Sequence, residues 1–395
     1  MLMKVIIKMN KPIYLDYAAA TPTDPRVIDV MVKCLTKDGC FANPHAKDHV
    51  YGWEACEIME NARSQVAELV GCSPLEITFT SGATESNNLA IFGLAKYLAS
   101  QGDKRRHIIT TKIEHKAVLE ACEQLEHQGY KVTYLTPHQD GRVDEELLES
   151  VLDEETFLVS IAQANSVLGS VNDIKKLSSL TRAKGAYFHT DTAQSAGYIE
   201  TDFAHSDVSL ATLTSEKVCG PKGVGALYIK RSQNLKLYAQ IFGGGQEKGL
   251  RGGTVATHQV AGMGKAFEIL KHEGSQDKER LEDFREYLIS RLKAIKGIII
   301  NGSPSMHVPG ILSVSFNHVD GRVLLPTLNG IAVSTGSACA SADLKPSYIL
   351  TAIGLSDEQA RASLRISFGR FTTKEEIQMA ADEICLKVPK LIKED

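Results

Sequence analysis

The feature that most constrains the fold is a regular alternation of short β-rich runs with helix-like stretches through the first two thirds of the chain. Amphipathic helices are expected between several runs, for example over residues 114–127 and 173–184. Because strands that alternate with helices usually build parallel sheets, the sequence predicts an α/β fold with a mainly parallel sheet. The β-rich runs cover residues 76–80, 107–111, 131–135, 157–162, 186–191, 208–213 and 225–230.

The pattern changes near residue 262. A long charged helical stretch over residues 263–295 is followed by strand-like runs at 311–317 and 364–368, and then by a helix from Thr373. This order is typical of a smaller α+β unit. We therefore expect a large domain of residues 12–260 and a small domain made of residues 1–11 and 261–395.

Composition excludes several classes of protein. The net charge of the 395 residues is -4, which gives no reason to expect direct nucleic-acid binding. No apolar run approaches the roughly 20 residues that span a bilayer, and the lysine-interrupted start lacks the features of a signal peptide. We expect a cytoplasmic protein that has no membrane contact. The eight cysteines form no C-x-x-C pair, so neither a disulfide framework nor a metal site is expected.

Polar residues follow the predicted strands where each strand ends. Residues 81–84 (Ser-Gly-Ala-Thr) open a helix after one strand, and His115 follows the next. Asp191 and Gln194 lie at the end of a later strand, and Lys217 follows another. Open α/β sheets bind ligands beyond the carboxyl ends of their strands. The sequence therefore predicts that these residues converge on one pocket.

Each of these residues indicates a chemistry and also has a simpler explanation. The turn at Gly82 and Ala83 offers free N–H groups to a phosphate, although it is equally typical of a plain helix cap. Lys217, before a Gly-Pro-Lys-Gly turn, can form a Schiff base with an aldehyde cofactor, whereas most lysines are solvated surface residues. His115 is compatible with ring stacking or a structural role. Arg365, in a strand-like run, is suited to a substrate carboxylate or to an edge strand.

Cys339 lies within residues 334–342, a run of small residues. Such a run has little packing volume and high backbone freedom, which favours a mobile surface loop. A buried structural cysteine usually has bulky apolar neighbours. Cys339 is therefore a candidate for a thiol that carries a reactive group from one place to another.

With these residues assembled, the chain resembles the cysteine desulfurases of the NifS/IscS type, over nearly its whole length. The resemblance implies a fold type I transferase that depends on pyridoxal 5'-phosphate, with a mainly parallel seven-stranded sheet in a large domain and a smaller α+β C-terminal domain. It also implies a homodimer with the active site near the subunit interface. The motifs that carry it are at residues 14–19, 80–87, 114–118, 191–195, 220–228, 336–339 and 369–373.

The resemblance also implies a role for each candidate residue. Lys217 would hold the cofactor covalently, Asp191 would pair with its pyridine nitrogen, and His115 would stack on its ring. Arg365 would bind the substrate carboxylate, and Cys339 would carry sulfur as a persulfide. The remaining implied contacts are Gln194 with the phenolic oxygen, Gly82, Ala83, Thr84 and Thr214 with the phosphate, Thr254 with the phosphate of the other subunit, and Asn165 with the substrate.

The reaction implied by this resemblance converts L-cysteine to L-alanine and hands sulfur to an acceptor protein. That acceptor is either a scaffold for iron–sulfur clusters or a relay for tRNA thiolation. Three positions depart from the family pattern, which has histidine, glutamate and tyrosine where this chain has Glu216, Val167 and Cys219. These departures leave two alternatives: a diverged enzyme acting on another amino acid, and a weakly active, partner-binding or regulatory paralogue.

Overall fold

The computed structural model describes residues 11–335 and 346–393. Its largest element is a seven-stranded sheet with the strand order β2-β8-β7-β6-β5-β3-β4. β8 alone runs opposite to the other six strands of this sheet, so the predicted mainly parallel sheet is confirmed. The strands are β2 (Ile77–Thr80), β3 (His107–Thr111), β4 (Lys131–Leu135), β5 (Thr156–Ser160), β6 (Tyr187–Asp191), β7 (Leu210–Thr214) and β8 (Gly225–Ile229).

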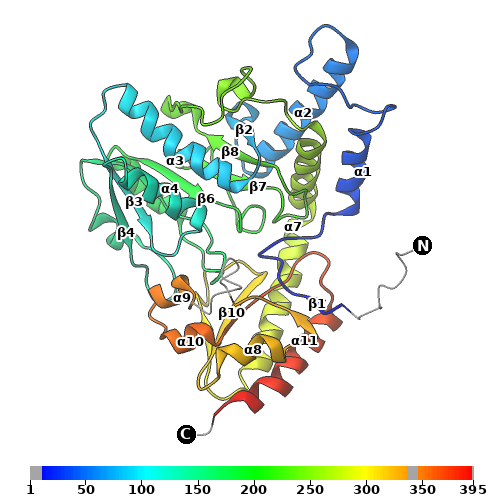
Figure 1. Ribbon diagram of the computed structural model, residues 1–395, viewed down its shortest axis with the longest axis vertical. Coiled ribbons are helices and arrows are strands. Elements are labelled where there is room, and N and C mark those ends of the chain that lie inside the picture. The colour runs from blue at the N-terminus through cyan, green and yellow to red at the C-terminus, as the bar shows by residue number, and fades with distance from the viewer. Residues whose placement is uncertain (1–10, 336–345, 394–395) are drawn as a thin grey trace.

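Helices cover both faces of this sheet, which fills the upper part of the molecule in Figure 1. Alternate strand residues supply the two faces: Ile108 packs with α3 and α4, whereas Ile109 packs with α2, α6 and α7. Parallel sheets need cover on both faces because their strands are apolar on both sides. The covering helices are α2 (Val50–Leu69), α3 (Ala83–Ser100), α4 (Lys116–Glu126), α6 (Ile174–Ala183) and α7 (Thr257–Leu292), and α1 (Pro25–Lys33) and α5 (Glu145–Glu149) complete this part of the chain.

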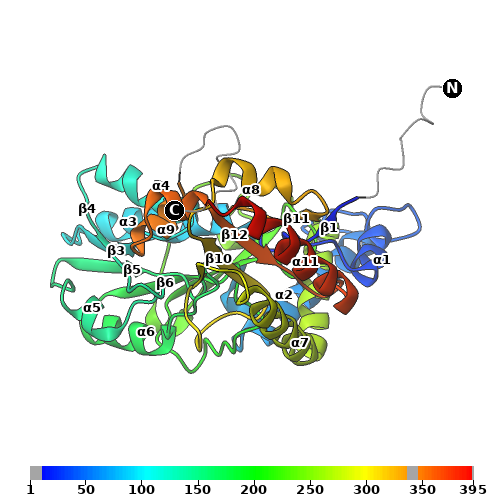
Figure 2. The same ribbon diagram turned by 90° about the horizontal axis from the view of Figure 1, so that it is seen from below.

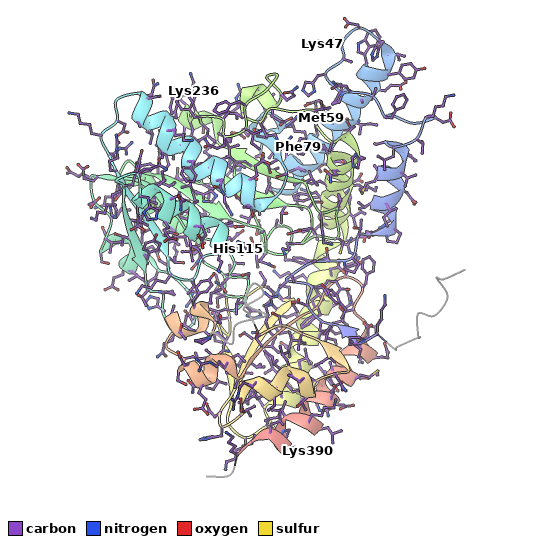
Figure 3. The ribbon with its side chains drawn as sticks, viewed as in Figure 1. Lys47, Met59, Phe79, His115, Lys236 and Lys390 are labelled. Atoms are coloured by element: carbon purple, nitrogen blue, oxygen red, sulfur yellow. The ribbon has the colours of Figure 1, made fainter. Side chains whose placement is uncertain are left out.

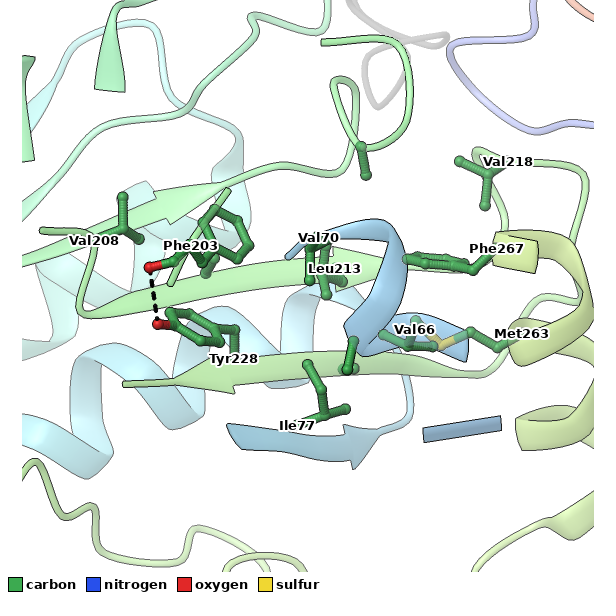
Figure 4. Packing of buried hydrophobic residues seen from close by; sticks show 14 of the residues in the cluster. Val66, Val70, Ile77, Phe203, Val208, Leu213, Val218, Tyr228, Met263 and Phe267 are labelled. Carbon is green, nitrogen blue, oxygen red and sulfur yellow. Dashed lines mark hydrogen bonds between the residues drawn. The ribbon is translucent and has the colours of Figure 1, made fainter. Parts of the chain in front are cut away.

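One face of the sheet holds the largest cluster of buried apolar side chains. Figure 4 shows Val66 of α2, Val70 just after that helix, and Met263 and Phe267 of α7 close to strand residues such as Leu213. At the other end of the view, Phe203 stacks on Tyr228, with ring centroids 4.8 Å apart. This packing fixes the strands, and with them the loops at the strand ends.

The C-terminal third forms the lower part of the molecule, which Figure 2 shows from below. A smaller antiparallel sheet has the order β12-β10-β9, and a two-stranded parallel sheet joins β1 to β11. The 36-residue helix α7 belongs to both cores, because Phe267 packs in the upper core and Leu288 in the lower one. The remaining strands are β1 (Ile13–Tyr14), β9 (Ile298–Asn301), β10 (Ile311–Phe316), β11 (Ile331–Ala332) and β12 (Ser363–Ser367), and the remaining helices are α8 (Gly321–Thr327), α9 (Tyr348–Ala352), α10 (Asp357–Arg361) and α11 (Lys374–Lys387).

Local capping explains where several helices begin. Asp173 accepts a hydrogen bond from Lys176 N at the start of α6, and Thr373 forms a reciprocal capping box with Glu376 at the start of α11. The helices predicted from Asp173 and Thr373 therefore begin one residue later than expected. Within the described ranges, no helix combines the length and apolar character that crossing a bilayer requires.

Candidate active site

A cavity of about 630 Å³ lies where the parallel strands end. It brings together side chains from separate strand ends and from β12, as the sequence predicted for a single pocket. Figure 3 shows His115 near the level where the upper and lower parts of the molecule meet. The candidate residues that line the cavity are Gly82, Ala83, Thr84, His115, Asn165, Asp191, Gln194, Thr214, Lys217 and Arg365.

The turn between β2 and α3 forms an anion cradle. Gly82 is the N-cap of the 18-residue helix α3 and makes no side-chain cap, so the first N–H groups of α3 face the cavity with no side chain to satisfy them. A Cβ atom on Gly225 of β8 would lie 2.7 Å from the Cα of Gly82, so only glycine allows this close approach. Thr84 and Thr214 add hydroxyls to the same cavity lining.

Lys217 follows β7 and turns its side chain into the cavity. Its Nζ donates a hydrogen bond to the carbonyl of Ala19 and lies 3.4 Å from Oε1 of Glu216. Burial lowers the pKa of the Lys217 amine below its usual range, and the carboxylate of Glu216 opposes that shift. Glu216 is one of the three departures from the family pattern, and its carboxylate therefore faces the reactive amine instead of turning away from it.

Asp191 ends β6 with both carboxylate oxygens held. Asn87 donates to Oδ2 at 2.8 Å, and the backbone N–H of Ala193 donates to Oδ1 at 2.9 Å. Gln194 is held nearby, because its Nε2 donates to the carbonyl of Ala18 at 3.0 Å. These contacts fix an acidic group and an amide on one wall of the cavity.

Arg365 reaches the cavity from β12, and its guanidinium is only partly satisfied. Nη2 donates to Asp16 at 2.7 Å, and Nη1 donates to the carbonyl of Ser166 at 3.0 Å. Nε is buried and makes no hydrogen bond to the part of the chain that the structure describes. A planar donor that is held on one edge and unsatisfied on another is suited to a carboxylate ligand.

Asn165 and His115 both make local hydrogen bonds. The Asn165 side chain donates to the carbonyl of Ile113 and accepts from Val167 N and Leu168 N, each at 2.8–2.9 Å. His115 is the N-cap of α4 and accepts from Ala117 N at 3.1 Å through Nδ1. Both still line the cavity. Their predicted roles toward substrate and cofactor remain predictions.

The structure also shows residues that the sequence analysis missed. Glu114 is fully buried beside His115 and accepts from Thr111 Oγ1 and Ala162 N, and burial raises the pKa of its carboxyl to about 8. Ser347 and Tyr348, at the start of α9, line the cavity although they lie far away in the sequence. The sequence did offer one sign of these two residues: they are a polar pair that follows the run of small residues around Cys339.

Two of the three departures lie in closely packed surroundings. Val167 is 2% exposed within an apolar cluster that includes Ile113 and Ile349. Cys219 is buried with a left-handed backbone (φ 60°), and burial raises the pKa of its thiol to about 11. The Cys219 thiol therefore stays protonated near neutral pH and is a poor nucleophile.

The two remaining candidate residues are Thr254 and Cys339. Thr254 is exposed and does not line it. Cys339 lies outside the described residues. The residues that flank the undescribed segment do reach the site: Pro346 lines the cavity, and Ser334 pairs with the backbone of Arg365.

The residues present fit a phosphorylated aldehyde cofactor. An uncapped helix N-terminus suits a phosphate, a buried amine suits an aldehyde, and a held carboxylate suits a protonated ring nitrogen. All three come from strand ends of one sheet and line one cavity. The donor set therefore agrees with pyridoxal 5'-phosphate.

Comparison with known proteins agrees with this geometry. The aminotransferase class-V family matches residues 13–379. Cysteine desulfurase IscS of Stutzerimonas stutzeri is 51% identical over 97% of this chain and 94% of its own length. The same enzyme from Pseudomonas aeruginosa is 50% identical over the same shares.

Solved structures are similar as well. A "NifS-like protein" superposes with a TM-score of 0.87 and 35% identity over 95% of this chain and 98% of its own. "SspA in complex with cysteine" superposes with a TM-score of 0.80 and 36% identity over 91% of this chain and 99% of its own. The alternatives of another substrate or a regulatory paralogue are not favoured by these relatives. The chain belongs to the aminotransferase class-V family and, within it, to the cysteine desulfurases that depend on pyridoxal 5'-phosphate.

Proposed function

We propose that this protein converts L-cysteine to L-alanine and transfers the sulfur to Cys339 as a persulfide. The observation that carries the proposal is the convergence of an anion cradle, the Lys217 amine, the Asp191 carboxylate and the half-satisfied Arg365 on one cavity. The step balances without an external oxidant. The carbon–sulfur bond of cysteine breaks, a sulfur–sulfur bond forms at Cys339, and the substrate carbon gains a proton.

Each residue's proposed role follows from what it offers. Arg365 binds the substrate carboxylate, with Asn165 beside it, and Asp191 pairs with the pyridine nitrogen of the cofactor. Bound pyridoxal 5'-phosphate supplies an electron sink for the substrate's α-carbon. Lys217 holds the cofactor and, once displaced by the substrate, takes the Cα proton; its lowered pKa suits that task. The remaining cofactor contacts are Gln194 at the phenolic oxygen, His115 on the ring, and Gly82, Ala83, Thr84 and Thr214 at the phosphate.

The position of Cys339 in the chain supports its role. Ser334 exchanges backbone hydrogen bonds with Arg365, and Pro346 lines the cavity. The described residues before and after the segment that carries Cys339 therefore lie at Arg365 and at the cavity, respectively. As a thiolate, Cys339 attacks the sulfur of the substrate.

We also propose that the protein is a homodimer. Two groups of aromatic side chains are exposed, one around Phe41 and Trp53 and the other around Tyr238 and Phe242, which is 83% exposed. Such exposure is unusual for a monomer and typical of an interface. Thr254, which is also exposed, would then contact the phosphate in the cavity of the partner subunit.

The wider context is proposed on the same basis. The sulfur acceptor would be a protein, either a scaffold for iron–sulfur clusters or a relay for tRNA thiolation, and the location would be the cytoplasm. We keep the division into a large domain of residues 12–260 and a small domain of residues 1–11 and 261–395. The long helix α7 would link them, because its residues contribute to both cores.

The first test is product analysis of cofactor-loaded protein with L-cysteine and a reductant. We expect alanine and sulfide in equal amounts. The Cys339→Ala variant should lose both products, because it lacks the thiol that attacks the sulfur of the substrate. Cys40→Ala, which removes a partly exposed thiol that does not line the cavity, should keep them. A cofactor-loaded wild-type protein that yields neither product would refute the proposal.

A further inference from the structure

Ser347 is an unusual residue at the edge of the active-site cavity. It is the N-cap of α9, a position where serine normally accepts a hydrogen bond from the helix, yet its side chain makes no cap. The residue is 3% exposed, and its Oγ finds no hydrogen-bond partner in residues 11–335 and 346–393. A buried hydroxyl without a partner destabilises the folded chain. Such a group calls for an explanation beyond the fold.

The surroundings hold Ser347 against the wall that carries Arg365. The hydroxyl of the next residue, Tyr348, donates to the carbonyl of Glu114 at 2.7 Å. Ile349 packs in the same apolar cluster as Val167, whose neighbour Ser166 accepts from Arg365 Nη1. The segment of Ser347 and the side chain of Arg365 therefore both contact the loop that contains Ser166 and Val167, and both residues line the same cavity.

A second unsatisfied donor occurs at this wall. Among the residues that the structure describes, the buried Arg365 Nε has no hydrogen-bond partner, while its two other nitrogens donate to Asp16 and to the carbonyl of Ser166. A carboxylate has two oxygens and accepts hydrogen bonds from both a hydroxyl and a guanidinium.

We propose that Ser347 is a substrate-binding residue, whose hydroxyl and Arg365 Nε together bind the α-carboxylate of the amino-acid substrate. This inference rests on the proposed function for the existence of an amino-acid substrate. It explains why both donors are left unsatisfied by the fold, since a site built to hydrogen-bond a substrate leaves polar groups unpaired without that substrate.

The proposal predicts opposite effects on stability and on binding. Ser347→Ala removes a buried hydroxyl that stabilises nothing in the free protein, so the melting temperature should stay the same or rise. The same change should raise the KM for L-cysteine and the Kd for L-alanine about five- to tenfold, and lower kcat less. A purely structural hydroxyl would lower the melting temperature and leave KM unchanged.

Ser356 provides a matched control. It is the N-cap of α10, accepts a hydrogen bond from Gln359 N and forms a capping box, and it does not line the cavity. Ser356→Ala should lower the melting temperature and leave KM unchanged. If the proposal is right, Ser347→Ala raises the KM without lowering the melting temperature, whereas Ser356→Ala lowers the melting temperature without changing the KM.

The experiment uses the cofactor-loaded, full-length protein, with L-alanine affinity followed by the visible absorbance of the cofactor. A KM and Kd for Ser347→Ala within twofold of the wild-type values would overturn the proposal, and so would a fall in melting temperature as large as that of Ser356→Ala. Failure of the wild type to form alanine from L-cysteine would refute the proposed function instead. The L-alanine affinities would still decide the role of Ser347.

Discussion

The neighbouring side chains of Glu216 and Lys217 set the charge at the reactive end of the cavity. Their charged atoms lie 3.4 Å apart, and the Lys217 side chain is 16% exposed. Burial favours the neutral amine, whereas the carboxylate of Glu216 favours the ammonium form. The neutral amine is the form that reacts with an aldehyde, so Glu216 opposes cofactor loading in two ways: it stabilises the wrong form of Lys217 and brings negative charge into a cavity expected to hold a phosphate.

We therefore predict that Glu216→Gln and Glu216→His load pyridoxal 5'-phosphate at lower pH and retain it better than the wild type. Removing the carboxylate lowers the pKa of Lys217 further, so the neutral amine persists to lower pH. The measurement is cofactor absorbance after loading across a pH series and after dialysis. Glu154→Gln, which changes an exposed carboxylate outside the cavity, is the control. Retention in both Glu216 variants equal to the wild type would contradict the prediction.

At the residue scale, the candidates that could be predicted were those at strand ends. Asp191 ends a β-rich run, Gln194 and Lys217 follow such runs, and the geometry of open sheets brings these positions together. The role proposed for Ser347 could not be predicted, because it is argued from a missing hydrogen bond, and only the tertiary structure reveals that the bond is missing. The pairing of Arg365 with Asp16 was missed for the same reason, because those residues are 349 positions apart.

At the scale of elements, the strands of the large sheet were predicted at the right places in the chain, although several of their end residues differ from those expected. The strands β3 and β4 match the expected residues, because polar or charged residues delimit their apolar runs on both sides. The start of α7 was expected at residue 263 and lies at Thr257, since no side chain caps this helix and its first turns are buried by tertiary packing. The short helices α8, α9 and α10 were not predicted, because five- to seven-residue helices carry no clear periodicity.

The loop before α7 is held by one buried ion pair. Glu247 is 7% exposed, accepts from both terminal nitrogens of Arg63 at 2.8 Å, and accepts from Phe79 N of β2 at 2.8 Å. Both Glu247 and Lys248 have a left-handed backbone, with φ of 46° and 58°. The ion pair thus holds a strained turn against β2, the strand that leads to the anion cradle.

We predict that Glu247→Gln lowers the free energy of unfolding by about 3 kcal/mol, because it leaves the buried Arg63 charge with only the half-exposed carboxylate of Glu60 beside it. Glu60 provides a matched control on the same arginine: it contacts Arg63 Nε at 3.1 Å, but its side chain is 51% exposed. Glu60→Gln should cost less than about 1 kcal/mol. The measurement is urea unfolding of both variants with the cofactor bound. Equal losses in the two variants would show that the buried pair has no special role.

At the scale of the whole molecule, the sequence predicted an α/β part followed by a smaller α+β part, and the seven-stranded sheet followed by the smaller antiparallel sheet, each with its own core, agrees with that order. How one helix serves both cores was not predictable. The periodicity of α7 is continuous, whereas the surface that it covers changes between Leu270 and Leu281. Only the positions of the two sheets determine where that change occurs.

Phe242 is the residue through which the proposed dimer is most directly tested, because 83% of its surface is exposed in the single chain. We predict that Phe242→Glu produces monomers, since a carboxylate at an apolar interface would have to be buried without a partner. Light scattering after size-exclusion chromatography gives the mass. Leu386→Glu is the control, because Leu386 is 62% exposed on α11 and should not affect assembly.

The monomer should also retain pyridoxal 5'-phosphate less well on dialysis, because Thr254 is exposed and would no longer reach a phosphate in the partner subunit. Thr254→Ala should then weaken retention in the dimer and change nothing in the Phe242→Glu monomer. This non-additivity separates a contact across the interface from a contact within one chain. A Phe242→Glu protein that stays dimeric would move the interface elsewhere. A monomer with undiminished retention would show that each cavity is complete without its partner.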